Sequence, residues 1–171
     1  MTRIIADPYQ ALQSLVGTEL GVSPWRLIGQ DTIDAFADAT DDHQWIHVDK
    51  TRAASGPNNG TIAHGLLLLS FIPAFSSEVY EIERVQVRIN YGFDSVRFLS
   101  PVPEGSRIRD RITLTAVDQR DTDVKLSTSH TIEIEGRERP ACVAASITLL
   151  IPTRPQSDPS PNPNPSRGAR Q

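Results

Sequence analysis

The spacing of hydrophobic residues predicts two helices in the first half of the chain. In "QDTIDAFADATDD" (30–42), three apolar residues recur at helical spacing: Ile33, Phe36 and Ala37. A second helix is predicted to start near "TIAHG" (61–65) and to run through "LLLLSFIPAF" (66–75), where Pro73 should kink or end it. Because this second helix is apolar on nearly every side, we expect it in the middle of the fold.

After Glu83 the hydrophobic period changes from helical spacing to strict alternation, which is typical of strands. Four such segments follow one another: "RVQVRINYGF" (84–93), "RITLTAV" (111–117), "VKLSTSHTIEI" (124–134) and "CVAASITLLI" (142–151). Turn-rich stretches separate them at 100–106, 118–123 and 135–140. With an earlier strand around "PWRLI" (24–28), the order predicts an α+β fold in which a curved antiparallel sheet covers one helix.

The length of 171 residues suits one domain and a tail. We expect residues 1–151 to form the domain. From Pro152 onward the chain is dense in Pro, Ser and Asn without large apolar side chains. Such a segment cannot offset the entropy of ordering, so residues 152–171 are predicted to be a disordered tail.

Composition and charge exclude several classes of partner. The 17 basic residues are scattered and outnumbered by 21 acidic ones, which argues against nucleic acid. The most apolar run, 65–75, is about half the roughly 20 residues needed to cross a bilayer, so we expect no membrane partner. The lone Cys142 and the absence of a secretory pattern at the start predict a cytoplasmic protein.

The stretch "DDHQWIHVDK" (41–50) crowds acids and histidines together and has three interpretations. A metal site would use His43 and His47 with Asp42 or His64, but neither zinc-finger nor zincin spacing is present. A polar loop anchored by apolar neighbours needs no function. An acid/base pair would place Asp42 and His47 on either side of one water molecule.

A second motif, "GTIAHG" (60–65), favours the acid/base interpretation. Here a glycine-flanked turn enters the apolar helix, so the N–H groups near His64 and Gly65 would point out of its first turn without partners. Such donors can hold a carbonyl oxygen that gains negative charge. An acid/base pair with oxyanion donors can add water next to a thioester carbonyl, and it would serve other enolate chemistry equally.

The segment "FADATDDHQWIHVDKTRAASGPNNGTIAHGLLLLSFIP" (36–73) resembles the MaoC-like dehydratases, or (R)-specific enoyl-CoA hydratases. Their signature joins Asp-x4-His to a downstream Ala-His-Gly helix start. The resemblance implies a hot-dog fold, a homodimer with acyl-CoA sites near the subunit interface, and no metal or other cofactor. It also implies reversible syn hydration of trans-2-enoyl-CoA to (R)-3-hydroxyacyl-CoA in fatty-acid metabolism.

Carried over by position, the resemblance places the catalytic pair on Asp42 and His47 and the oxyanion donor on the N–H of Gly65. The order of base and acid stays open, with Asp42 favoured as the base. Gln44, where many members have asparagine, is expected to support the loop through hydrogen bonds. For His64 we expect a capping or packing role at the substrate-binding helix start, in preference to direct proton transfer.

Two departures from the family pattern concern the pocket. Asp41 replaces the usual glycine, and a second carboxylate there would raise the pKa of Asp42 if both were shielded from solvent. Pro73 stands where some members have serine, with Ser70 as a weak substitute. Two other functions remain alternatives: a hot-dog acyl-CoA thioesterase, and a non-catalytic acyl-CoA-binding dimer partner.

Overall fold

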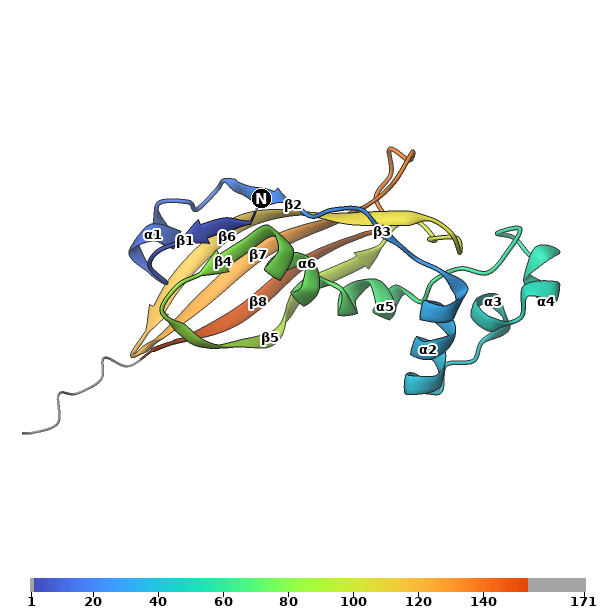
Figure 1. The fold of residues 1–171 in the computed structure, drawn as a ribbon, viewed down its shortest axis with the longest axis horizontal. Coiled ribbons are helices and arrows are strands. Elements are labelled where there is room, and N and C mark those ends of the chain that lie inside the picture. Colours follow the sequence, from blue (N-terminus) through green and yellow to red (C-terminus); the bar gives the residue numbers. More distant parts are fainter. Residues whose placement is uncertain (1, 154–171) are drawn as a thin grey trace, which may run out of the picture.

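A six-stranded sheet forms the scaffold of the computed structural model, which describes residues 2–153 (Figure 1). The strands follow the order β2, β6, β7, β8, β5, with β3 paired to β6, and all these pairs are antiparallel. Their bounds are β2 Glu19–Val22, β3 Arg26–Leu27, β5 Val85–Phe98, β6 Arg107–Arg120, β7 Asp123–Ile134 and β8 Cys142–Pro152. The predicted α+β class and the four long strands are confirmed.

The predicted central helix is present but broken in two. Helix α5 spans Gly65–Ser70 and α6 spans Ile72–Val79, with Phe71 between them and Pro73 in the first turn of α6. The backbone nitrogen of Pro73 carries no hydrogen, so it cannot donate the usual helical hydrogen bond. This explains why the helix breaks near the position at which the sequence predicted a kink. Within residues 2–153, no helix is long and apolar enough to span a membrane.

Most of the remaining helices form a separate group at one end of the sheet (Figure 1). They are α2 Gln30–Thr40, α3 Trp45–Val48 and α4 Lys50–Ala54. Helix α2 matches the predicted 30–42 helix and buries Ile33 and Ala37. This end of the molecule therefore carries the segment in which acids and histidines are crowded.

The N-terminal segment contains elements that the sequence did not reveal. Strand β1 (Arg3–Ile5) pairs in parallel with β4 (Tyr80–Ile82), and α1 spans Gln10–Gln13. Elements of three or four residues show too little periodicity to be recognised from the sequence. In addition, the strand that pairs with β1 lies far away in the sequence. The predicted tail lies, from residue 154 onward, outside the described residues, while Pro152 belongs to β8.

Two hydrophobic clusters fill the space between the helices and the sheet. One surrounds Phe75 of α6, and the other surrounds Val79 at the end of the same helix. A buried polar network lies between them on β6, β7 and β8: Asp110, Thr128, His130 and Ser146. In this network His130 Nδ1 lies 2.6 Å from Asp110 Oδ2, and its Nε2 lies 3.0 Å from Ser146 Oγ. His130 therefore belongs to the buried interior of the sheet.

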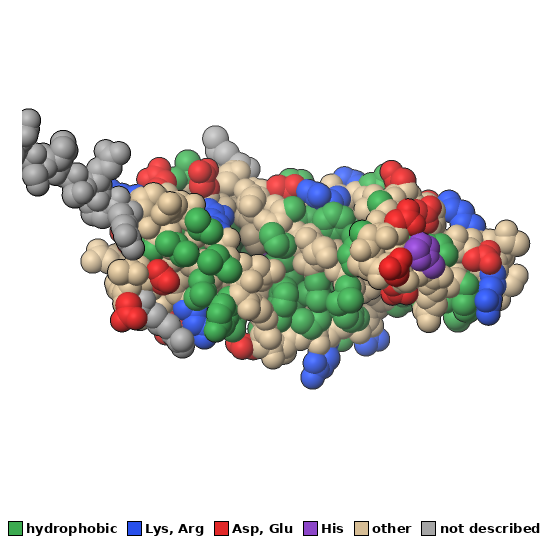
Figure 2. Space-filling model, turned by 90° about the horizontal axis from the view of Figure 1, so that it is seen from below, with side chains coloured by type: hydrophobic (Ala, Val, Ile, Leu, Met, Phe, Trp, Pro, Cys, Tyr) green, Lys and Arg blue, Asp and Glu red, His purple; other side chains and the backbone are tan. Residues whose placement is uncertain are grey.

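One face of the broken helix and the neighbouring edge strand remain uncovered. Leu66 on α5 is 61% exposed, although this helix was expected in the middle of the fold. Val87, Ile89 and Tyr91 on β5 are also exposed. Figure 2 shows hydrophobic side chains along the middle of the face seen from below. The two helix segments bury most of their apolar side chains as expected, and in the single chain the side of α5 that carries Leu66 faces outward.

Candidate active site

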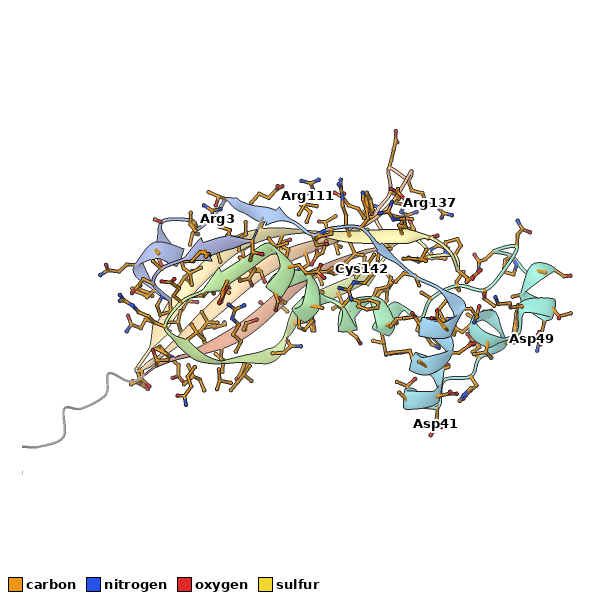
Figure 3. The ribbon with its side chains drawn as sticks, in the orientation of Figure 1. Arg3, Asp41, Asp49, Arg111, Arg137 and Cys142 are labelled. Carbon is orange, nitrogen blue, oxygen red and sulfur yellow. The ribbon has the colours of Figure 1, made fainter. Side chains whose placement is uncertain are left out.

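The site begins where helix α2 ends. Its C-cap, Asp41, has a left-handed conformation with φ 58°, which favours glycine but which aspartate also tolerates. This explains how aspartate replaces the glycine of the family pattern. Asp41 points away from the sheet (Figure 3), and both Asp41 and Asp42 are exposed. The shielding from solvent that would couple the two carboxylates is therefore absent.

His47 lies in the short helix α3 and is buried, with 7% of its surface exposed. Its Nδ1 is 2.7 Å from the carbonyl oxygen of Ile62. Because a carbonyl can only accept, Nδ1 must carry the proton, and Nε2 of the neutral ring keeps its lone pair. Burial lowers the pKa of His47 against the opposing effects of the Ile62 hydrogen bond and the Asp42 charge.

His64 is the N-cap residue of α5, and its ring stacks on that of His47 with a centroid distance of 3.7 Å. Its Nε2 lies 2.9 Å from the backbone oxygen of Asp42, so this nitrogen donates. The Phe36 ring of α2 lies 5.1 Å away on another side. His64 thus ties the segment containing Asp42 to the start of α5, which fits the predicted packing role.

A hydrogen-bond network that was not identified from the sequence holds the backbone of His47 in place. The Gln30 side chain donates to the backbone oxygen of His47 at 2.7 Å, and its amide oxygen accepts from the Thr61 hydroxyl. Thr61 is itself buried. The network joins the start of α2, the helix α3 and the loop before α5. A lone glutamine at a helix start carries no sequence signal for this role.

Gly65 is the first residue of α5, and its N–H makes no hydrogen bond within residues 2–153. This agrees with the orphan donor expected at a helix start. A Cβ added at this position would lie 3.0 Å from three ring atoms of Phe98. Glycine therefore permits a close aromatic contact at this position, and Phe98 is a neighbour that the sequence did not identify.

The structure places Gln44 and His43 differently from the positions considered from the sequence. Gln44 caps α3 through its backbone oxygen, which accepts from the N–H of His47 at 2.9 Å. Its side chain is exposed and makes no capping hydrogen bond, so the expected side-chain support is replaced by a backbone contact. His43 is exposed and pairs with Asp38 at 2.9 Å, which raises the pKa of His43. His43 therefore does not belong to the site.

The structure brings Asp42, His47 and His64 together, with one potential ligand atom from each within 4.8 Å of the others. This differs from the His43-containing metal cluster considered from the sequence. Two imidazoles and a carboxylate can relay protons, and the same donors suit a transition metal. Gly65 adds a free backbone donor at the adjacent helix start.

The fold and the site together define a hot-dog protein with an Asp/His pair beside the start of its central helix. The model of the MaoC-like domain matches residues 11–136, and the chain belongs to this family. It is 47% identical to 3-hydroxyacyl-thioester dehydratase Z of Mycobacterium tuberculosis over 141 residues, 82% of this chain and 93% of the relative.

Two further comparisons extend this assignment. Nodulation protein N of Rhizobium leguminosarum bv. viciae is 46% identical over 153 residues, covering 88% of this chain and 92% of the relative. The structure of the (R)-hydratase from A. caviae involved in PHA biosynthesis superimposes with a TM-score of 0.63 at 23% identity, covering 78% and 94% of the two chains. The hot-dog fold predicted by resemblance is confirmed.

Proposed function

We propose that the protein catalyses the reversible syn hydration of trans-2-enoyl-CoA to (R)-3-hydroxyacyl-CoA without a metal or redox cofactor. The observation that carries the proposal is the free Nε2 lone pair of buried His47 beside Asp42, next to the unpaired N–H of Gly65. The similarity to a 3-hydroxyacyl-thioester dehydratase over 93% of its length supports the same substrate class.

In the proposed mechanism, the thioester carbonyl oxygen accepts a hydrogen bond from the Gly65 N–H, which makes C3 of the enoyl group electrophilic. Water lies between Asp42 and His47. As the water oxygen bonds to C3, His47 Nε2 takes one proton from the water. Asp42 orients the water by accepting a hydrogen bond from its other hydrogen. The enolate that forms is stabilised by the Gly65 donor.

The proton on His47 is then transferred to C2, which regenerates the neutral imidazole and releases the 3-hydroxyacyl thioester. Because the water and the proton come from the same side, the addition is syn. The negative charge of Asp42 favours the transient imidazolium. This mechanism makes His47 the base, whereas the sequence alone favoured Asp42; the support comes from the Ile62 carbonyl, which fixes the tautomer of His47.

We further propose that the protein works as a homodimer. The uncovered face of α5 and the edge strand β5 expose Leu66, Val87, Ile89 and Tyr91. Several exposed apolar side chains beside a sheet edge are typical of a protein interface. Sedimentation at several protein concentrations tests this, and a concentration-independent monomer would contradict it.

The hydratase proposal is tested with crotonyl-CoA. Loss of enoyl absorbance without free thiol indicates hydration, thiol release indicates a thioesterase, and binding without turnover indicates a non-catalytic partner. Asp42→Asn and His47→Gln should each lower turnover by roughly 10²- to 10⁴-fold. Circular dichroism checks that both variants are folded, and chiral analysis of the product checks the (R) configuration.

A further inference from the structure

We propose that Gln30 is a positioning residue of the active site. Its side-chain amide holds His47 and Ile62 together, so that Nδ1 of His47 keeps its proton and Nε2 stays free. The contacts themselves are seen in the structure. Their consequence for catalysis rests on the proposed function, in which Nε2 of His47 takes a proton from the attacking water.

The Gln30 side chain has a partner for each of its hydrogen-bonding groups. Its amide nitrogen donates to the backbone oxygen of His47 and to Oδ1 of Asp34, each at 2.7 Å. Its amide oxygen accepts from the hydroxyl of Thr61. A carbonyl and a carboxylate can only accept, so one orientation of the amide satisfies all three partners. The side chain therefore has a defined place between α2, α3 and the loop before α5.

The first part that Gln30 holds is the backbone of His47. Helix α3 is a single turn of four residues, and a helix of this length is not stable by itself. The backbone oxygen of His47 lies in its last turn, where carbonyl groups lack partners inside the helix. The Gln30 amide supplies such a partner from the first turn of α2, a helix of 11 residues. The position of the His47 backbone is thus tied to a longer helix.

The second part that Gln30 holds is the loop that carries the acceptor of the His47 ring. Thr61 is buried and directly precedes Ile62. The N–H of Ile62 donates to the backbone oxygen of Ile46 at 3.0 Å, and the oxygen of Ile62 accepts from Nδ1 of His47 at 2.7 Å. Gln30 therefore holds both the residue that donates from Nδ1 and the segment that accepts, so it helps to fix the distance between them.

The tautomer of His47 decides whether its ring can act as the base. With the proton on Nδ1, the lone pair is on Nε2, whereas a neutral ring with the proton on Nε2 can only donate from that nitrogen. The Ile62 oxygen accepts from Nδ1 and so favours the first tautomer. A longer distance between Nδ1 and this oxygen weakens the preference and allows the ring to turn. The expected loss is in kcat, because the Gly65 N–H that holds the thioester in the proposed mechanism is unchanged.

The test begins with Gln30→Met, which keeps the length of the side chain and removes its polar atoms. A misplacement of about 1 Å can cost 10²-fold in rate, so kcat for crotonyl-CoA should fall about tenfold or more, with KM within about threefold of wild type. Thr61→Val should lower kcat in the same direction. The double variant should be within about twofold of Gln30→Met, because both residues act in one network.

Two conservative variants serve as controls. Thr61→Ser keeps the hydroxyl that donates to Gln30 and should retain the activity that Thr61→Val loses. Asp34→Ala removes only the exposed contact of the Gln30 amide, which water can replace, so its kcat should stay within about twofold of wild type. Circular dichroism checks that every variant is folded.

Two readouts separate positioning from a loss of folded protein. NMR spectra of protein with ¹⁵N-labelled histidine show which ring nitrogen carries the proton, and His47→Gln assigns the signals. The neutral His47 ring should be protonated on Nδ1 in wild type and on a mixture of both nitrogens in Gln30→Met.

The second readout is the pH profile of kcat/KM. The Ile62 hydrogen bond raises the pKa of His47, so weakening this bond lowers that pKa and moves the acid limb of the profile to lower pH. The opposing effect of burial and the charges of His64 and Asp42 act on His47 in both proteins. A smaller amount of folded protein, in contrast, lowers the rate equally at every pH.

Several results would overturn the proposal: a neutral His47 ring protonated on Nε2 in wild type, an unchanged tautomer in Gln30→Met, or a fall in kcat without a shift of the pH profile. Equal losses in Asp34→Ala and Gln30→Met would also overturn it. If Gln30→Met fails to fold, Thr61→Val provides the same test, since valine has nearly the shape of threonine. A wild type without hydratase activity would contradict the proposed function, whereas the ¹⁵N spectra would still decide whether Gln30 positions His47.

Discussion

The contact between Gly65 and Phe98 allows a quantitative test of how the start of α5 is positioned. A methyl group at residue 65 would lie 3.0 Å from three atoms of the Phe98 ring, whereas ordinary contacts begin at 3.4 Å. Gly65→Ala therefore forces the ring or the helix start to move by about 0.4 Å. The alanine keeps its N–H, so the variant changes the position of the donor without removing it.

The expected effect is on activity more than on stability. Phe98 is 48% exposed, so its ring can yield toward solvent. Replacing glycine by alanine at a compatible position stabilises by about 0.4–1 kcal/mol, which offsets part of the steric cost. A misplacement of about 1 Å at an active site can cost 10²-fold in rate, so a shift near half of that predicts a loss of roughly tenfold in kcat/KM.

The assay is crotonyl-CoA hydration by Gly65→Ala, Phe98→Ala and the double variant, with urea unfolding as the control for stability. Removing the ring removes the clash, so the double variant should recover to within about threefold of Phe98→Ala. Wild-type activity in Gly65→Ala would refute the reasoning. A double variant as impaired as Gly65→Ala would also refute it, because the ring could then not be the cause.

Three further predictions concern other parts of the molecule. His130→Leu leaves the buried Asp110 carboxylate without its partner and should lower the free energy of unfolding by about 3–5 kcal/mol in urea; a loss below 1 kcal/mol would contradict the network's role. The Cys142 thiol is fully buried and burial raises its pKa to about 11, so iodoacetamide at about pH 8 should react only with unfolded protein. Labelling of native protein at the rate of a free thiol would disagree with this. His43→Gln removes only an exposed contact with Asp38 and should leave kcat within about twofold of wild type; a tenfold loss would place His43 in the site after all.

The long elements of the fold were predictable because each carries its own periodic signal. Strands β5 to β8 and helix α2 repeat their hydrophobic pattern over many residues. The break near Pro73 was also predictable, since proline acts locally. The short β1 was not, because its stability comes from parallel pairing with β4, 75 or more residues away. The exposure of Leu66 was missed because periodicity does not tell which side of a helix the sheet covers.

The candidate site likewise has one part that the sequence predicts and another part that only the tertiary structure shows. The sequence by itself determined the residue types and spacings, with Asp42 and His47 in one segment and Gly65 at a helix start. Only the tertiary structure decided which nitrogen of His47 is free and that His64 stacks on His47. The hydrogen bonds by which Gln30 and Thr61 hold the backbone of His47 also appear only in the folded chain. The physical reason is that these contacts join segments that follow separate local patterns. They form only when the loop before α5 folds back against α3, and that arrangement is set by packing and backbone hydrogen bonds.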